Sequence, residues 1–265
     1  MKKRFKKIIK KIKTLEVQGA EDVAKTGIKA FLIEPNKQAA KILLKSRPTE
    51  PLLQNAIKRL LKAENKKREA NKILREIEKA HKQAVSKGKK LIKNNMNIYT
   101  HCHSSTVIDI LKQAKQISKK RFVVYTTEVE PRLQGRMTAR ELSNAHIKTI
   151  IAPDLAAEHI IRKCDLFLFG ADAFTKKGVV NKIGTSFLCE LAKKYHIPRY
   201  SCGISMKYAN KVKLEKRPGK EVWDDGDKLI DIENPAFDFV NKKLLTGIIS
   251  EHGILTYKQF LKKVK

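Results

Sequence analysis

From Asn97 onward the chain alternates short apolar segments with segments of helical periodicity, and this alternation restricts the possible folds more than any other feature. The apolar segments lack the polar alternation of a half-exposed strand, so we expect each to be buried on both faces. Buried strands separated by helices are typical of a parallel sheet covered by helices. We therefore predict an α/β fold with a Rossmann-like, doubly wound parallel sheet. The predicted strands are 97–100, 122–127, 149–152, 166–170 and 199–203, and the predicted helices between them lie near 105–119, 137–145, 155–163 and 183–195.

The chain before this alternation is predicted to form a helical domain, 1–95, followed by the Rossmann-like domain at 96–265. Its first helix carries an apolar stripe made of Phe5, Ile8, Ile9, Ile12 and Leu15. A stripe on a basic helix can lie on a membrane surface, but packing against neighbouring helices is commoner, and we expect packing here.

Further helices are predicted at 20–33, 37–45 and 64–92, and another is expected to start at Ser46-Arg47-Pro48-Thr49. Proline has no N–H to lose in a first helical turn, so Pro48 suits that position. Arg47 would then stand at a helix N-terminus, where its charge and the backbone could hold an anion together.

The segment Thr100-His101-Cys102-His103-Ser104-Ser105 joins the first predicted strand to the helix after it. Ser104 or Ser105 is a candidate N-cap. Cys102 would lie beside a helix N-terminus, whose partial positive charge favours thiolate over thiol and also attracts anions. A half-buried cysteine without a catalytic role is the alternative interpretation. On a strand the two histidines point away from the cysteine, so a three-ligand metal site is not expected.

Two further polar stretches follow predicted strands. Arg132 and Arg136, in the loop 127–136, could clamp a phosphate, or the loop could simply be solvated. Asp172 follows a wholly apolar strand, where burial should raise its pKa and suit it to acid–base work, unless it only caps a turn. Asn181 and Lys182 could complete an anion site. Because ligands bind at the carboxyl ends of parallel strands, we expect these stretches to converge with the Cys102 segment.

The charge of the chain is strongly positive, +31 from 58 basic and 27 acidic residues. Such a field attracts nucleic acid or anionic membranes, but the lysines are spread over the whole sequence and aromatic residues make up only 6%. Specific nucleic-acid binding is therefore not expected, whereas phosphorylated substrates would be attracted. The four cysteines have no zinc-ligand spacing, and no apolar run approaches the roughly 18 residues of a membrane span. We expect a cytoplasmic protein with reduced thiols.

Several motifs, taken in order, resemble a known superfamily. They are Ser46-Arg47-Pro48-Thr49, Thr100-His101-Cys102-His103-Ser104, Thr127-Glu128, Gln134-Gly135-Arg136-Met137-Thr138-Ala139, Gly170-Ala171-Asp172, Asn181-Lys182-Ile183-Gly184-Thr185 and Asn234-Pro235-Ala236-Phe237-Asp238. This set is similar to the superfamily that joins the alpha, beta and delta regulatory subunits of translation initiation factor 2B with sugar-phosphate isomerases. The resemblance runs from about Leu15 to Gly253.

The resemblance implies a helical N-terminal domain, a Rossmann-like C-terminal domain, and homodimers or homohexamers assembled through the latter. Isomerases of the superfamily carry a catalytic cysteine and aspartate, which correspond to Cys102 and Asp172, while the regulatory subunits generally lack the cysteine. His103-Ser104 is similar to the archaeal ribose-1,5-bisphosphate isomerases. Gln18 takes the place of the arginine in their Arg-Gly-Ala motif, before Gly19.

The expected activity is conversion of ribose 1,5-bisphosphate to ribulose 1,5-bisphosphate, with proton transfers shared by Cys102 and Asp172. No metal or redox cofactor is expected, and AMP is an expected activator. The alternatives are a non-catalytic regulatory subunit, a methylthioribose-1-phosphate isomerase and an RNA-associated protein. The predicted substrate and phosphate ligands are Gly19, Ala20, Arg47, Arg132, Gly135, Arg136, Asn181 and Lys182.

Overall fold

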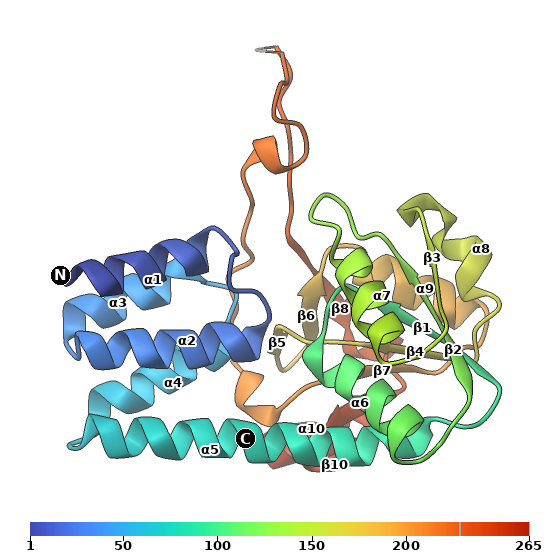
Figure 1. Ribbon diagram of the computed structural model, residues 1–265, viewed down its shortest axis with the longest axis horizontal. Coiled ribbons are helices and arrows are strands. Elements are labelled where there is room, and N and C mark those ends of the chain that lie inside the picture. The colour runs from blue at the N-terminus through green and yellow to red at the C-terminus, as the bar shows by residue number, and fades with distance from the viewer. Residues whose placement is uncertain (228, 265) are drawn as a thin grey trace.

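The structure, a computed structural model, describes residues 1–227 and 229–264. Helices from the N-terminal part form one side of the molecule, and a sheet flanked by helices forms the other (Figure 1). The long helix α5 (Lys66–Gly88) runs along both, packing against α4 (Pro51–Lys62) and against α6 (Ser105–Gln116). The predicted α/β fold class is confirmed. The division into domains at residue 95 stays a prediction.

The N-terminal helices agree with the sequence pattern except around Arg47. Besides α4, α5 and α6, the α-helices are α1 (Lys3–Lys13), α2 (Ala20–Ile33), α3 (Lys37–Ser46), α7 (Gln134–Asn144), α8 (Ala157–Ile161), α9 (Thr185–Lys194) and α10 (Tyr257–Val264). In the apolar stripe, Phe5, Ile9 and Ile12 are buried against neighbouring helices, as expected. Leu15 lies beyond the end of α1 and lines a pocket instead.

The expected helix start at Pro48 is wrong, because α4 begins at Pro51. A proline disfavours the helical conformation in the residue before it, and Arg47 is indeed non-helical, with φ −144° and ψ 82°. Arg47 is therefore the C-cap of α3 and does not stand at a helix N-terminus. The second proline, Pro51, occupies the first helical turn instead. The predicted helix 64–92 ends earlier, at Gly88, and a 3₁₀ turn, Lys89–Leu91, follows it.

Within the part of the chain that the structure describes, the main sheet has seven strands in the order β10-β9-β7-β4-β1-β2-β3, and only the pair β9–β10 is antiparallel. The five predicted strands are confirmed. The strands are β1 (Met96–His101), β2 (Phe122–Thr127), β3 (Thr149–Ala152), β4 (Leu166–Phe169), β7 (Arg199–Cys202), β9 (Gly247–Ser250) and β10 (Gly253–Leu255). His101 pairs with Phe169 in register, so the segments that follow β1 and β4 leave the sheet side by side.

A second, three-stranded antiparallel sheet was not predicted. It has the order β5-β6-β8 and comprises β5 (Ala173–Phe174), β6 (Gly178–Lys182) and β8 (Phe237–Asn241). β5 is too short to show a period, and all of β6 is buried, so neither strand alternates in polarity. This sheet stands at the carboxyl ends of the main strands and brings Asn181 and Lys182 there (Figure 1).

Within the described residues no helix is both long and apolar enough to cross a membrane.

Candidate active site

A pocket opens where the carboxyl ends of β1 and β4 meet the start of α2. Most of the residues singled out in the sequence line it. They are Gly19, Ala20, Arg47, Cys102, Arg132, Asp172, Asn181 and Lys182. The expected convergence of the strand-end stretches is therefore confirmed.

Cys102 is held at the junction of strand and helix. Its backbone has a left-handed φ of 65°, and its carbonyl accepts a hydrogen bond from Thr138 Oγ1 at 2.8 Å. Ser104 caps α6, as expected, by accepting from the backbone N–H of Val107. The expected thiolate is not favoured, because burial raises the pKa of Cys102 to about 11 and the nearby Lys182 offsets this only in part. With this pKa, the protonated thiol is the form expected at neutral pH.

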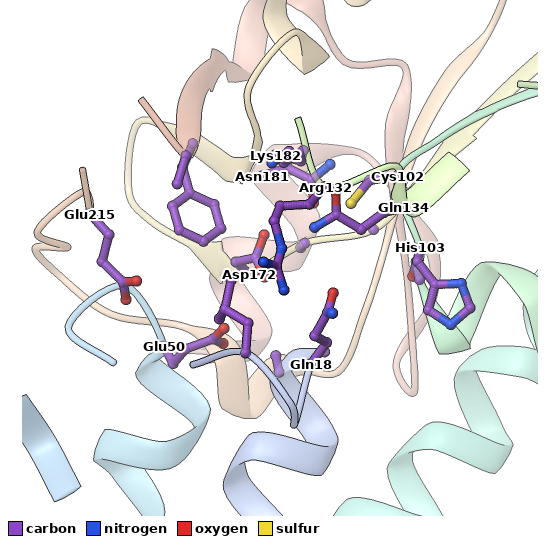
Figure 2. A pocket seen from close by; sticks show the side chains of 18 of the residues that line it. Gln18, Glu50, Cys102, His103, Arg132, Gln134, Asp172, Asn181, Lys182 and Glu215 are labelled. Atoms are coloured by element: carbon purple, nitrogen blue, oxygen red, sulfur yellow. The ribbon is translucent and has the colours of Figure 1, made fainter. Parts of the chain in front are cut away.

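Asp172 follows β4 and points into the pocket (Figure 2). Its backbone N–H donates to the Val180 carbonyl of β6 at 2.9 Å, which ties it to the small sheet. Burial raises the pKa of Asp172, while Lys207 and Arg47 pull it down. The pKa is raised overall, as expected from the apolar strand before it.

Lys182, at the end of β6, faces Cys102 and Asp172 from the small sheet (Figure 2). Burial lowers the pKa of Lys182, and the neighbouring Cys102 and Asp172 counteract this. The side chain of Asn181 donates to Thr185 Oγ1 at 3.0 Å, which fixes its amide beside the start of α9.

The expected clamp of two arginines is not formed. Arg132 lines the pocket, but Arg136 is half exposed and pairs with Glu128 at 2.5 Å outside the described lining. Gly135 does not line the pocket either. A Cβ at Gly135 would stand 1.6 Å from the Thr127 carbonyl oxygen, so glycine is required there for close packing of the backbone. The neighbouring Gln134 lines the pocket and was missed as a site residue.

The N-terminal part contributes the turn before α2. Gly19 is the N-cap of α2, with a φ of 78° that L side chains rarely adopt. Gln18, Gly19 and Ala20 all line the pocket, and Figure 2 shows the Gln18 side chain reaching into it.

Arg47 reaches the pocket but is already paired. Its Nη2 donates to Glu50 Oε1 at 2.7 Å, and its Nε donates to Glu215 Oε1 at 3.3 Å. All three side chains are more than nine-tenths buried. Arg47 therefore lines the pocket as a partner of two carboxylates, and its role as a phosphate ligand stays a prediction.

Five charged lining residues were not predicted, namely Glu50, Lys207, Glu215, Arg217 and Glu221. Four of them lie in the segment 203–236, which connects β7 to β8 and has no periodicity that could place it. Glu50 directly follows the motif Arg47-Pro48-Thr49, so its position beside that motif could have indicated that it belongs to the site. Lys207 is buried, and its Nζ donates to the Ala171 carbonyl at 2.8 Å, so it supports the segment that carries Asp172.

The two histidines beside Cys102 have structural partners. His101 Nε2 lies 2.9 Å from the Ile183 carbonyl, and burial lowers the pKa of His101 to about 4. His103 Nδ1 lies 3.1 Å from Thr138 Oγ1. In 1–227 and 229–264, His, Cys, Asp and Glu side chains form no cluster of three that could hold a metal ion.

Comparison with known proteins matches the model of the Initiation factor 2 subunit family to residues 4–257. A ribose 1,5-bisphosphate isomerase of Methanocaldococcus jannaschii is 31% identical, over 95% of this chain and 91% of its own. A methylthioribose-1-phosphate isomerase of a Thermoanaerobacter species is 32% identical, over 89% of this chain and 79% of its own. The crystal structure of the Pyrococcus horikoshii translation initiation factor eIF-2B superposes with a TM-score of 0.89 at 29% identity, over 98% of this chain and 99% of that one. The chain belongs to the Initiation factor 2 subunit family.

Proposed function

We propose that this protein is an aldose–ketose isomerase of pentose 1-phosphates, with ribose 1,5-bisphosphate as the first substrate to test. The observation that carries the proposal is the meeting of Cys102 and Asp172 in one pocket, beside Lys182. The ribose 1,5-bisphosphate isomerases among the relatives support this substrate. In the proposed site, Cys102 and Asp172 do the proton transfers, and Gly19, Ala20, Arg132, Asn181 and Lys182 bind the substrate.

The reaction needs proton transfers and no net change of composition. The C1 phosphate locks the sugar as a ring, so an acid has to protonate the ring oxygen as its bond to C1 breaks. A base removes the proton from C2, which leaves an enol between C1 and C2. C1 then takes up a proton and the C2 hydroxyl loses one, which gives the ketone. Two protons are taken up and two are released, so no external oxidant is needed.

Cys102 and Asp172 suit this work because both can exchange a proton inside a largely buried site. Burial raises the pKa of each group, and the negative charge of Asp172 raises that of Cys102 further. The two groups titrate as a pair, so the roles of acid and base belong to the pair. Lys182 stabilises the negative charge that develops as the C2 proton leaves.

A second candidate is a non-catalytic regulatory subunit that keeps a sugar-phosphate pocket. The close superposition on the initiation factor eIF-2B and the presence of Gln18 favour it. The presence of both Cys102 and Asp172 favours the enzyme. A methylthioribose-1-phosphate isomerase is the nearest enzymatic alternative. Assembly as a homodimer or homohexamer, activation by AMP and a cytoplasmic location remain predictions.

The deciding experiment is direct turnover of ribose 1,5-bisphosphate and of 5-methylthioribose 1-phosphate, with the ketose product identified by NMR. We expect a ketose from at least one of them. A folded protein that binds a sugar phosphate but converts neither compound would support the regulatory subunit and refute the isomerase.

A further inference from the structure

Cys102 has an unusual backbone conformation for a residue that carries a side chain. Its φ of 65° lies in the left-handed region. Residues other than glycine adopt this region at a cost in free energy, and they keep it where neighbouring groups hold them there. The backbone angles of Cys102 also set where its side chain points, and Figure 2 shows the thiol pointing into the pocket. A group that holds this backbone therefore also holds the thiol in the pocket.

Thr138, in α7, is such a group. Its Oγ1 donates to the Cys102 carbonyl at 2.8 Å, and the residue is buried, with 1% exposed. A carbonyl can only accept, so the single hydroxyl proton of Thr138 is used in this bond. A threonine hydroxyl in a helix can also turn to the carbonyl one helical turn earlier, which here belongs to Gln134. The bond to Cys102 therefore depends on what fixes the direction of the hydroxyl.

His103 supplies this direction. Its Nδ1 lies 3.1 Å from Thr138 Oγ1. Because the hydroxyl proton is used towards Cys102, Nδ1 has to carry a proton and donate it to Oγ1. Burial lowers the pKa of His103, the charge of Glu141 raises it and that of Lys112 lowers it, and the pKa is lowered overall. The neutral ring then has its one proton at Nδ1. Glu141, which lies 3.5 Å from Nε2, is already bonded to Lys112 at 2.5 Å.

We propose that Thr138 is a positioning residue for the proton-transfer group Cys102, and that His103 directs the Thr138 hydroxyl to the Cys102 carbonyl. This role rests on the proposed isomerase function, because Cys102 transfers a proton only in that reaction. Proton transfer requires the two heavy atoms to lie within hydrogen-bond reach, about 2.6–3.2 Å. A displacement of the thiol by about 1 Å can lower the rate about a hundredfold. Thr138 thus acts on the rate through Cys102.

The test compares wild type with Thr138→Val, which has almost the same side-chain volume but no hydroxyl. The assay is turnover of ribose 1,5-bisphosphate and of 5-methylthioribose 1-phosphate, normalised to the folded fraction from unfolding curves. We expect kcat to fall about 10- to 100-fold, with KM within about threefold because the groups that bind the substrate are unchanged. Thr138→Ser restores the hydroxyl and should recover kcat to within about threefold of wild type.

Thr149→Val is the matched control, since Thr149 Oγ1 also donates to a backbone carbonyl, that of Ile147, at 3.1 Å. Thr149 starts β3, outside the described lining of the pocket, so kcat and KM should stay within about twofold. A destabilised fold alone would lower the folded fraction and not kcat per folded molecule. A folded Thr138→Val protein with the kcat of wild type would overturn the proposal, and so would a Thr138→Ser protein as slow as Thr138→Val.

A second measurement does not depend on turnover. Cys102 is half-buried and the other three cysteines are buried, so alkylation by iodoacetamide is followed at Cys102 by mass spectrometry of its peptide. Loss of the Thr138 hydroxyl frees the backbone of Cys102 and exposes the thiol. Alkylation at a fixed pH should therefore be at least about threefold faster in Thr138→Val than in wild type. Thr138→Ser and Thr149→Val should react at the wild-type rate.

The two measurements separate the possible failures. If wild type converts neither compound but the alkylation rates differ as expected, the isomerase is refuted and the positioning of Cys102 by Thr138 stands. Equal alkylation rates in wild type and Thr138→Val would overturn the positioning.

If Thr138→Val does not fold, the same bond is tested from His103. His103→Asn keeps an N–H donor near the place of Nδ1, and His103→Leu removes it. We expect kcat to fall at least about tenfold in His103→Leu and to stay within about threefold in His103→Asn. Equal kcat values in these two variants would show that His103 does not direct the hydroxyl, and would overturn the proposal.

Discussion

The pocket has two walls whose side chains are held in different ways. The sheet wall carries Cys102, Asp172 and Lys182, at the ends of β1, β4 and β6. Backbone bonds fix it, such as the one from Asp172 to Val180. The opposite wall comes from helix ends and from the segment 203–236, and ion pairs between residues far apart in the chain fix it, such as Arg47 with Glu215. Regular structure thus positions the reactive groups, and long-range pairs set the charge around them.

The largest effects are expected on the sheet wall. Cys102→Ser and Asp172→Asn should each lower kcat at least about a thousandfold, because each removes a proton-transfer group and keeps the side-chain volume. The measurement is kcat with the preferred substrate, beside unfolding curves that should hardly change. Cys164→Ser, at a buried cysteine outside the pocket, is the matched control and should keep kcat within about twofold.

A folded Cys102→Ser or Asp172→Asn protein with nearly full activity would contradict the prediction that the sheet wall carries the proton-transfer groups. The reactive groups would then have to lie elsewhere, and the sheet wall would only be a scaffold.

Two arginines in the loop after β2 give the next largest contrast. Arg132 lines the pocket, whereas Arg136 pairs with Glu128 at the surface. Arg132→Ala should raise KM by about 10- to 100-fold, the loss of a charge-assisted bond to phosphate. Arg136→Ala should change KM less than about twofold, since exposed ion pairs contribute little. Equal effects of the two substitutions would show that the loop rearranges when the substrate binds.

The sheet wall could be predicted from the sequence because its signals are local. An apolar run followed by Cys102 or Asp172 indicates both a buried strand and its carboxyl end, and the parallel arrangement then brings those ends together. The N-cap of α6 could be placed at Ser104 or Ser105 for the same reason, because a serine directly before a helical pattern is a local signal.

The opposite wall could not be predicted in this way. Nothing near Glu215 in the sequence indicates that it meets Arg47, because the two are 168 residues apart and the sequence around Glu215 has no periodicity that could place it. The burial of Glu50 depends on that meeting. The raised pKa of Cys102 was also not predicted, because burial of the thiol has a larger effect on its pKa than the partial positive charge of the helix N-terminus.

His81 on α5 links α2 to α6 and should give an intermediate effect. Its Nδ1 lies 2.9 Å from Glu21 of α2, and its Nε2 lies 2.8 Å from Asp109 of α6. Burial alone would lower the pKa of His81, but the bonds to Asp109 and Glu21 raise it to about 9. Because this pKa is above that of an unfolded histidine, about 6.5, the stabilisation is complete below that pH and is lost as the pH rises through about 9.

The measurement is the free energy of unfolding in urea for wild type and His81→Gln. We expect wild type to be more stable by about 1–2 kcal/mol at pH 6 and nearly equal at pH 10, allowing for screening of a partly exposed group. His159→Gln, at an exposed histidine, should change this free energy by less than about 0.5 kcal/mol. A difference at His81 that did not depend on pH would mean that the ring acts by packing and not by charge.

The smallest expected effect tests whether the opposite wall can be made more favourable for phosphate. Gln18 reaches into the pocket just before the N-terminus of α2, which attracts anions (Figure 2). Gln18→Arg adds a cation there, so KM for the preferred sugar phosphate should fall by up to about tenfold with little change in kcat. Gln83→Arg, on the exposed face of α5, adds the same charge outside this pocket and controls for the general field. If both substitutions lowered KM equally, the net charge of the protein would account for substrate attraction, and the position of the cation in the pocket would not. The two walls would then differ in their reactive groups but not in how they attract the substrate.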